Sequence, residues 1–158
     1  MGVWIVSLTL IIAWALAIFG VSAPGQQADS TFAISALHWM FYIPAGWMFL
    51  ASGVMHTLFA KSTAKNIGWK TNGFQYELGF VSFGLGVAGI VASYKGTSSW
   101  LILTIVISFF LGLAGINHVY EMIKNKNLSP GNTIILLYDF GLPVSLWILL
   151  YSAQLIKI

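Results

Sequence analysis

The sequence predicts an all-α polytopic membrane protein: a bundle of five transmembrane helices with the N-terminus inside and the C-terminus outside. Hydrophobic residues make up 58% of the 158 residues and charged residues only 7%, whereas a soluble domain carries about 25% charge. Five apolar stretches also approach or exceed the roughly 20 residues that a helix needs to cross a bilayer core. Because these stretches take up most of the chain, we expect residues 1–158 to form a single helical domain.

Composition excludes several other classes of protein. Seven lysines, no arginine and four acidic residues are too few to cover the surface of a soluble monomer. A nucleic-acid partner is not expected, because nucleic-acid binders need clustered basic side chains. The apolar content excludes a disordered chain. The chain has no cysteine, so it has no disulfide, thiolate metal site or cysteine nucleophile.

The five predicted spans differ in character. The first, residues 3–21, lacks a basic N-terminal region and is too long for the core of a signal peptide, so we expect it to be retained. The second, residues 34–60, is unusually long. The third and fourth, residues 74–94 and 100–123, are rich in glycine, and the fifth covers residues 133–153. Small residues let helices pack closely in lipid, either within the bundle or between the copies of a homo-oligomer. The glycines concerned are Gly79, Gly84, Gly86, Gly89, Gly112 and Gly115.

The placement of the lysines predicts the orientation. Two connections on one side of the predicted bundle carry most of the positive charge, and the positive-inside rule makes that side cytoplasmic. These lysines are Lys61, Lys65, Lys70, Lys124 and Lys126, whereas Lys95 and Lys157 lie on the opposite side. Tryptophans near the span ends are expected at the membrane interface. They are Trp4, Trp39, Trp69 and Trp100.

Most of the ionisable residues inside the spans lie at a similar depth. Counted at about 1.5 Å per residue from the lysine-bearing ends, they fall within the cytoplasmic part of the bundle. A charged side chain near the bilayer centre costs about 2.5–3.5 kcal/mol on insertion scales. We therefore interpret this layer as one site that faces the bundle interior. Its candidate residues are His56, Glu77, His118, Glu121 and Asp139.

The leading hypothesis for this layer is a transition-metal site. Imidazole and carboxylate together suit zinc, iron, manganese or copper. Helix bundles build such centres from glutamates and Glu-x-x-His pairs, and this chain has the reversed pair His118-x-x-Glu121. Bound metal would support redox or hydrolytic chemistry. The residues expected to orient the ligands are Ser52, Gln75, Asn117, Tyr120 and Tyr138.

Three alternatives use the same residues differently. A proton-coupled transporter or channel for an ion or small solute would employ them as a proton relay, with a homo-oligomer supplying the pathway. A b-type haem would lie between His56 and His118. In a structural or partner-binding subunit, the same groups would only form hydrogen bonds between helices, each adding about 0.6 kcal/mol. No hydrolase or nucleotide-binding motif points to a catalytic residue.

Several segments between Gly53 and Pro143 resemble a family of small multipass prokaryotic membrane proteins of unknown function. The most specific of these segments are Ile67-Gly68-Trp69 and Phe74-Gln75-Tyr76-Glu77-x-Gly79. The resemblance implies a protein of the prokaryotic inner, or cytoplasmic, membrane whose partner is the lipid bilayer. It implies no activity, but it supports treating the polar layer as a unit.

Overall fold

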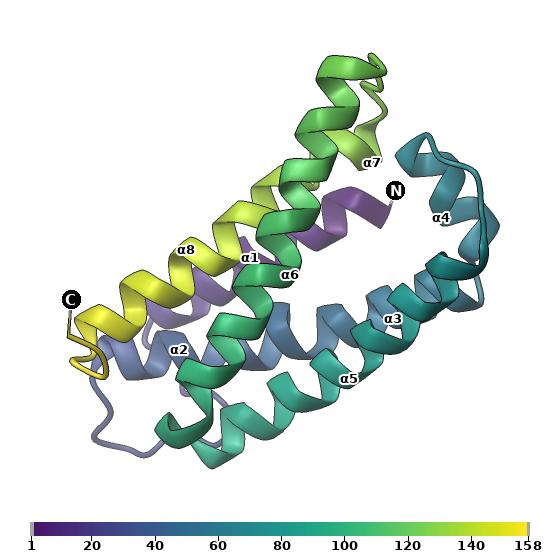
Figure 1. Ribbon diagram of the computed structural model, residues 1–158. Coiled ribbons are helices and arrows are strands. Elements are labelled where there is room, and N and C mark those ends of the chain that lie inside the picture. The colour runs from purple at the N-terminus through teal and green to yellow at the C-terminus, as the bar shows by residue number, and fades with distance from the viewer. Residues whose placement is uncertain (1, 158) are drawn as a thin grey trace.

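The computed structural model describes residues 2–157, which are helical with short connections and contain no strand (Figure 1). The helices, in chain order, are α1 (Gly2–Ile18), α2 (Phe32–Tyr42), the π-helical segment η1 (Ile43–Met48), α3 (Phe49–Thr57), α4 (Ala60–Ile67), α5 (Gly73–Lys95), α6 (Thr97–Lys124), α7 (Pro130–Thr133) and α8 (Leu136–Ser152). The predicted all-α class is therefore confirmed.

Four helical segments are long and apolar enough to cross a membrane. They are Phe32–Thr57, formed by α2, η1 and α3 without a break, then Gly73–Lys95, Thr97–Lys124 and Pro130–Ser152. The first predicted span is shorter than expected, because α1 ends at Ile18 and not at residue 21. Gly20 follows in the left-handed region, with φ of 68°, where a residue without a side chain is favoured and a helix cannot continue.

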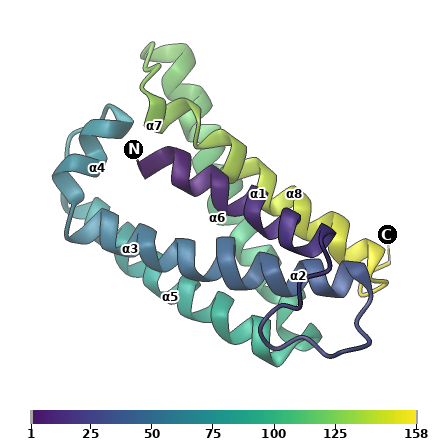
Figure 2. The ribbon, with the colours of Figure 1, turned by 180° about the vertical axis from the view of Figure 1, so that it is seen from behind.

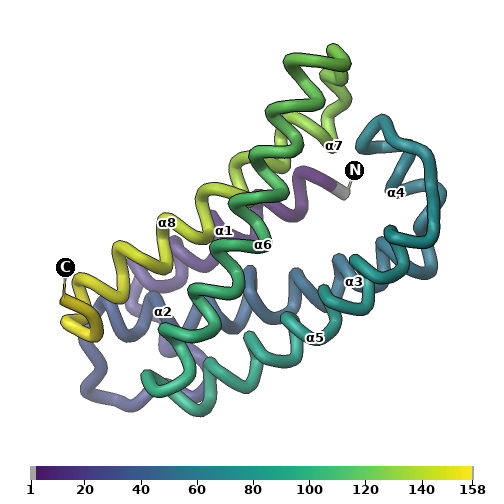
Figure 3. Tube along the Cα trace, in the orientation of Figure 1, coloured from purple at the N-terminus to yellow at the C-terminus, as the bar shows by residue number. Residues whose placement is uncertain are grey.

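The long helix α2–η1–α3 is the central element of the bundle. It packs against α5 along its length and also contacts α1 and α8 (Figure 2). Helices α5 and α6 meet at the turn through Gly96, with φ of 75°, and then diverge toward the end that carries α4 and α7 (Figure 3). The N-terminus lies at that end and the C-terminus at the opposite one (Figure 1).

Glycine allows the close approach of α5 to the central helix. A Cβ atom on Gly89 would lie 2.2 Å from the carbonyl oxygen of Ala45, and one on Gly86 would lie 2.7 Å from the amide nitrogen of Leu50. Such contacts with backbone atoms are closer than any side chain tolerates, so these predicted packing glycines act within the chain. Gly84, by contrast, faces open space.

One predicted loop is a helix. The connection that contains Lys61 and Lys65 was expected to be irregular, yet α4 occupies most of it, and the second span ends at Thr57 instead of residue 60. Spacing explains the helix, since Ala60, Thr63 and Ala64 are buried and lie on one face at i, i+3 and i+4. Helix α4 therefore covers the end of the bundle.

Two tryptophans that were expected at the membrane interface belong to the core. Trp39 and Trp100 are only 8% and 0% exposed. The indole Nε1 of Trp39 donates to the carbonyl of Val21, and that of Trp100 donates to the carbonyl of Ala92, both at 2.9 Å. The Val21 carbonyl lies beyond the end of α1, where no helical donor reaches it, whereas the Ala92 carbonyl also accepts from the amide of Gly96 at 3.0 Å.

The glycine packing predicts a position-specific loss of stability. Gly89→Ala places its Cβ against the Ala45 carbonyl, and we expect it to cost about 1–3 kcal/mol, measured as a lower melting temperature in detergent. Gly84→Ala on the same helix meets no atom within 4 Å and should be neutral or slightly stabilising. Equal melting temperatures for the two variants would contradict the close packing of α5 on η1.

Candidate functional site

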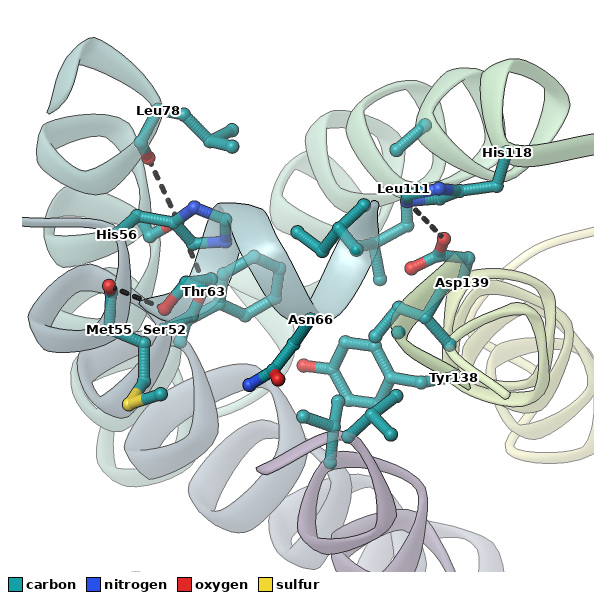
Figure 4. A pocket seen from close by; sticks show the side chains of 18 of the residues that line it. Ser52, Met55, His56, Thr63, Asn66, Leu78, Leu111, His118, Tyr138 and Asp139 are labelled. Carbon is teal, nitrogen blue, oxygen red and sulfur yellow. Dashed lines mark hydrogen bonds and ion pairs between the residues drawn. The ribbon is translucent and has the colours of Figure 1, made fainter. Parts of the chain in front are cut away.

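A cavity of about 350 Å³ lies near the α4–α7 end of the bundle (Figure 4). Helices α3, α4 and α5 line one side, α6 and α8 line the other, and Val3 and Val6 of α1 contribute a further wall. Most of the lining is apolar, so the few polar groups that reach the cavity stand out. The larger apolar side chains are Met48, Phe49, Met55, Leu78, Phe110 and Leu111.

The side chain of Asn132 holds His118 in position. Asn132 is completely buried, and its Nδ2 donates to the carbonyls of Asn127 at 2.9 Å and His118 at 3.2 Å. These two donations identify Oδ1 as the acceptor facing His118 Nδ1, 2.7 Å away. The imidazole therefore donates through Nδ1 and leaves Nε2 free.

The free nitrogen of His118 faces a carboxyl group on α8. His118 Nε2 lies 3.9 Å from Asp139 Oδ2, which is too long for a hydrogen bond. Asp139 is only 3% exposed, and its Oδ2 has no hydrogen-bond partner within residues 2–157. On its other side the His118 ring stacks on Trp69, with centroids 5.3 Å apart and planes inclined by 12°. Packing thus restrains both side chains while one carboxyl oxygen stays unpaired.

His56 approaches the same cavity from the opposite side (Figure 4). It lies on α3, and its Nδ1 is buried without a hydrogen-bond partner in the described part of the chain. One turn earlier, the hydroxyl of Ser52 also lines the cavity and lies 3.4 Å from the hydroxyl of Ser82 on α5. Three of the five predicted site residues therefore line one cavity: His56, His118 and Asp139.

The other two predicted site residues, Glu77 and Glu121, do not line this cavity. Glu77 is exposed on α5, whose cavity-lining residues are Leu78 and Ser82. Glu121 is half-buried and accepts a hydrogen bond from Asn125 Nδ2 at 2.9 Å. Both carboxylates lie near the predicted depth. Successive residues of a helix are rotated by about 100° about its axis, however, so residues at one depth can face different directions. Depth along the helix therefore does not by itself decide which residues face the cavity.

Some of the expected supporting residues belong to the cavity. Tyr138 lines it, and its buried hydroxyl donates to the carbonyl of Pro44 in η1 at 2.7 Å. This bond ties α8 to the central helix, and Phe49 packs against the same ring with centroids 6.2 Å apart. Asn117 also lines the cavity, although most of its side chain is exposed.

Two expected supporting residues have other partners. Gln75 Nε2 donates to the carbonyl of Ala60 at 2.7 Å, which joins the start of α5 to α4. Tyr120 is exposed on α6 and accepts a hydrogen bond from Lys124 one turn later. Neither residue lines the cavity, so neither supports the three residues that meet there.

Asn132 and Trp69 both contact the cavity residue His118, and the sequence hypothesis did not include them in the site. Asn132 is a lone amide at the start of an apolar segment, in a position that favours a turn. Trp69 was expected at the membrane interface. A weak signal was available for Asn132, because a polar side chain at the edge of a span requires a partner inside the protein.

Within residues 2–157 no group of three or more His, Asp or Glu side chains is placed to hold a metal ion. His118 and Asp139 form a close pair, but His56 lies across the cavity from them (Figure 4). The site thus has two polar walls, one formed by His56 and the other by His118 and Asp139, with an apolar space between them.

The fold and the cavity together define a class: a helical membrane protein with an internal cavity that is apolar apart from a few buried polar groups. The chain belongs to a family of unknown function, DUF6790, whose model matches residues 3–156. This match confirms the resemblance and extends it to α1. No curated protein and no solved structure matches the chain.

The bond between Asn132 and His118 predicts a large effect of a small substitution. Asn132→Ala leaves the buried Nδ1–H of His118 without an acceptor and the two carbonyls without their donor. We expect a loss of about 1–3 kcal/mol in unfolding free energy, measured as a lower melting temperature in detergent. Asn125→Ala removes an exposed amide and should change the melting temperature little. If both variants melt like the wild type, the proposed role of Asn132 is wrong.

Proposed function

We propose that this protein binds a small amphipathic molecule from the lipid bilayer in the cavity between α3–α5 and α6–α8. The observation that carries this proposal is the pairing of an apolar cavity of about 350 Å³ with two buried, unpartnered polar atoms, His56 Nδ1 and Asp139 Oδ2. Ligand sites are mostly apolar cavities of about 300–1,000 Å³ with a few polar groups that orient the ligand.

The unpartnered atoms favour a ligand over a purely structural role. A buried polar atom without a partner costs about 1–3 kcal/mol, and nearly all such atoms in native proteins are paired. In a structural subunit, His56 and Asp139 would be expected to pair with neighbouring helices. Both instead line the cavity, where a bound polar group supplies the missing hydrogen bonds.

The bilayer is the natural source of this ligand. Helices α5 and α6 both line the cavity, and both carry large exposed apolar residues. Phe80 is 62% exposed, Phe109 68% and Leu113 60%, which is the surface expected of lipid-facing helices. A molecule dissolved in the acyl chains would enter between α5 and α6 without crossing a polar surface.

A transition metal is the second candidate, favoured by the 3.9 Å approach of His118 to Asp139 and by His56 on the same cavity. Zinc, iron, manganese or copper would need His56 to swing toward the pair, because three protein ligands are the usual minimum for a catalytic site. Haem fits less well, since Asp139 faces the His118 nitrogen that would otherwise bind the iron.

A transporter has less support than a binding site. Two polar groups in the other half of the bundle bind neighbouring side chains, since Ser145 accepts from Trp14 Nε1 and Ser108 from Trp147 Nε1. A homo-oligomer with glycine-lined contacts would rely on Gly112 and similar open positions, since most of the helix glycines pack within the chain.

We also propose five spans, with the α4–α7 end facing the cytoplasm of a prokaryotic cell. Helix α1 has 17 residues, near the lower limit for a span, and it packs beside α2 and α8. Five of the seven lysines lie at the α4–α7 end, in α4, at the end of α6 or in the connections there, and the N-terminus lies at the same end (Figure 1). The positive-inside rule then gives an N-in and C-out protein.

Filling the cavity should abolish ligand binding. Ala114 lines the cavity, whereas its neighbour Leu113 is 60% exposed, so Ala114→Trp blocks the space and Leu113→Trp serves as the matched control. Native mass spectrometry of protein released from detergent should show a small lipophilic adduct on the wild type and on Leu113→Trp, but not on Ala114→Trp. The absence of any adduct, together with a stoichiometric transition metal that is lost in His118→Ala, would replace the ligand proposal with the metal.

The cysteine-free chain allows a direct test of orientation. In intact cells, a membrane-impermeant maleimide should label Lys95→Cys at once and Lys61→Cys only after permeabilisation. An appended N-terminal epitope should likewise be protected from external protease. Labelling of Lys61→Cys in intact cells would reverse the orientation, and digestion of the epitope would mean that α1 does not cross the membrane.

A further inference from the structure

We propose that the ligand belongs to the quinone and quinol class: a flat ring with an oxygen at each of two opposite edges and a hydrocarbon tail. This inference rests on the proposed function, because it names the occupant of the same cavity. It goes further in requiring that both polar walls bind the same molecule.

The two walls contribute hydrogen-bonding groups from opposite directions. His56 Nδ1 on α3 and Asp139 Oδ2 on α8 are both buried and unpartnered, and they lie on opposite sides of the cavity (Figure 4). Asp139 lines the cavity and is only 3% exposed, and its unpartnered Oδ2 lies 3.9 Å from His118 Nε2 on the same wall. An amphiphile with a single polar head would satisfy one wall and leave the other unpaired, which is costly for a buried group.

The same groups can bind an acceptor or a donor. A neutral imidazole donates or accepts at Nδ1 according to its tautomer, and a carboxyl group does so according to its protonation. Quinone oxygens only accept hydrogen bonds, whereas quinol hydroxyls also donate them. A pair of walls built from His56 and Asp139 therefore suits a ring whose oxygens change between these two roles.

The rest of the cavity suits a flat ring with a tail. Phe49, Phe110 and Tyr138 contribute aromatic faces between the polar walls, and aromatic rings stack favourably on one another. Phe80 on α5 and Phe109 on α6 are 62% and 68% exposed, so a hydrocarbon tail that reached these helices would lie among the lipids. A small hydrophilic ligand needs no aromatic walls on three helices.

The test compares a two-oxygen ring with a one-oxygen ring. Decylubiquinone and 4-decylphenol are titrated against purified protein, and their occupancy is measured by native mass spectrometry. We expect His56→Leu and Asp139→Leu each to weaken decylubiquinone binding about tenfold, the effect of losing one good hydrogen bond. The binding of decylphenol should be weakened by only one of the two substitutions, because this ligand has one oxygen.

His56→Leu leaves no partner unsatisfied, since Nδ1 has none, so this variant is expected to fold even if Asp139→Leu does not. Ser108→Ala, outside the cavity, controls for non-specific loss. Unchanged binding of decylubiquinone to His56→Leu would overturn the two-wall proposal. Failure of decylubiquinone to bind while another lipophilic adduct still occupies the cavity would overturn the quinone class alone. No adduct of any kind would overturn the proposed function as well.

Discussion

In a helix bundle surrounded by lipid, every polar group must find its partner inside the protein, because the hydrocarbon offers none. This constraint organises the contacts of the long helix Phe32–Thr57. In its π-helical segment the carbonyl of Pro44 accepts from Tyr138, and His38 Nδ1 lies 2.6 Å from the carbonyl of Ser93 on α5. Each bond joins the central helix to a different neighbour. Satisfying the backbone therefore also assembles the bundle.

Within residues 2–157 the cavity holds two of the three buried polar atoms that lack a partner; the third, Thr104 Oγ1, lies outside it. His118 is held in place, since Asn132 accepts from Nδ1 and Trp69 stacks on the ring, but Asp139 and His56 each keep one buried atom without a partner. Proteins retain such costs chiefly at sites where a ligand or a reaction removes them. The positions of the two atoms, on helices from opposite sides of the cavity, make a bound molecule the simplest explanation.

The depth of the polar residues was predictable from the sequence, but their direction was not. Counting residues from the lysine-bearing ends placed His56, His118 and Asp139 at one depth, and these three residues line one cavity. The same count included Glu77 and Glu121, which are rotated away from the cavity. A rise of 1.5 Å per residue gives height along a helix, but the face that points inward depends on how the neighbouring helices pack. Asn132 was missed for the same reason, because its role exists only once α7 lies against α6.

The sequence by itself determined the apolar segments long enough to cross a bilayer, the asymmetric distribution of lysine and the glycines available for close packing. It also determined the match to a family of unknown function. These properties are local, since each depends on the composition of one segment. Only the tertiary structure decided that the loop after α3 is a covering helix, that Trp39 and Trp100 lie in the core, and that three polar residues share one cavity. Those properties depend on the rotation of each helix about its axis and on the divergence of α5 from α6. Contacts between segments distant in the chain set both.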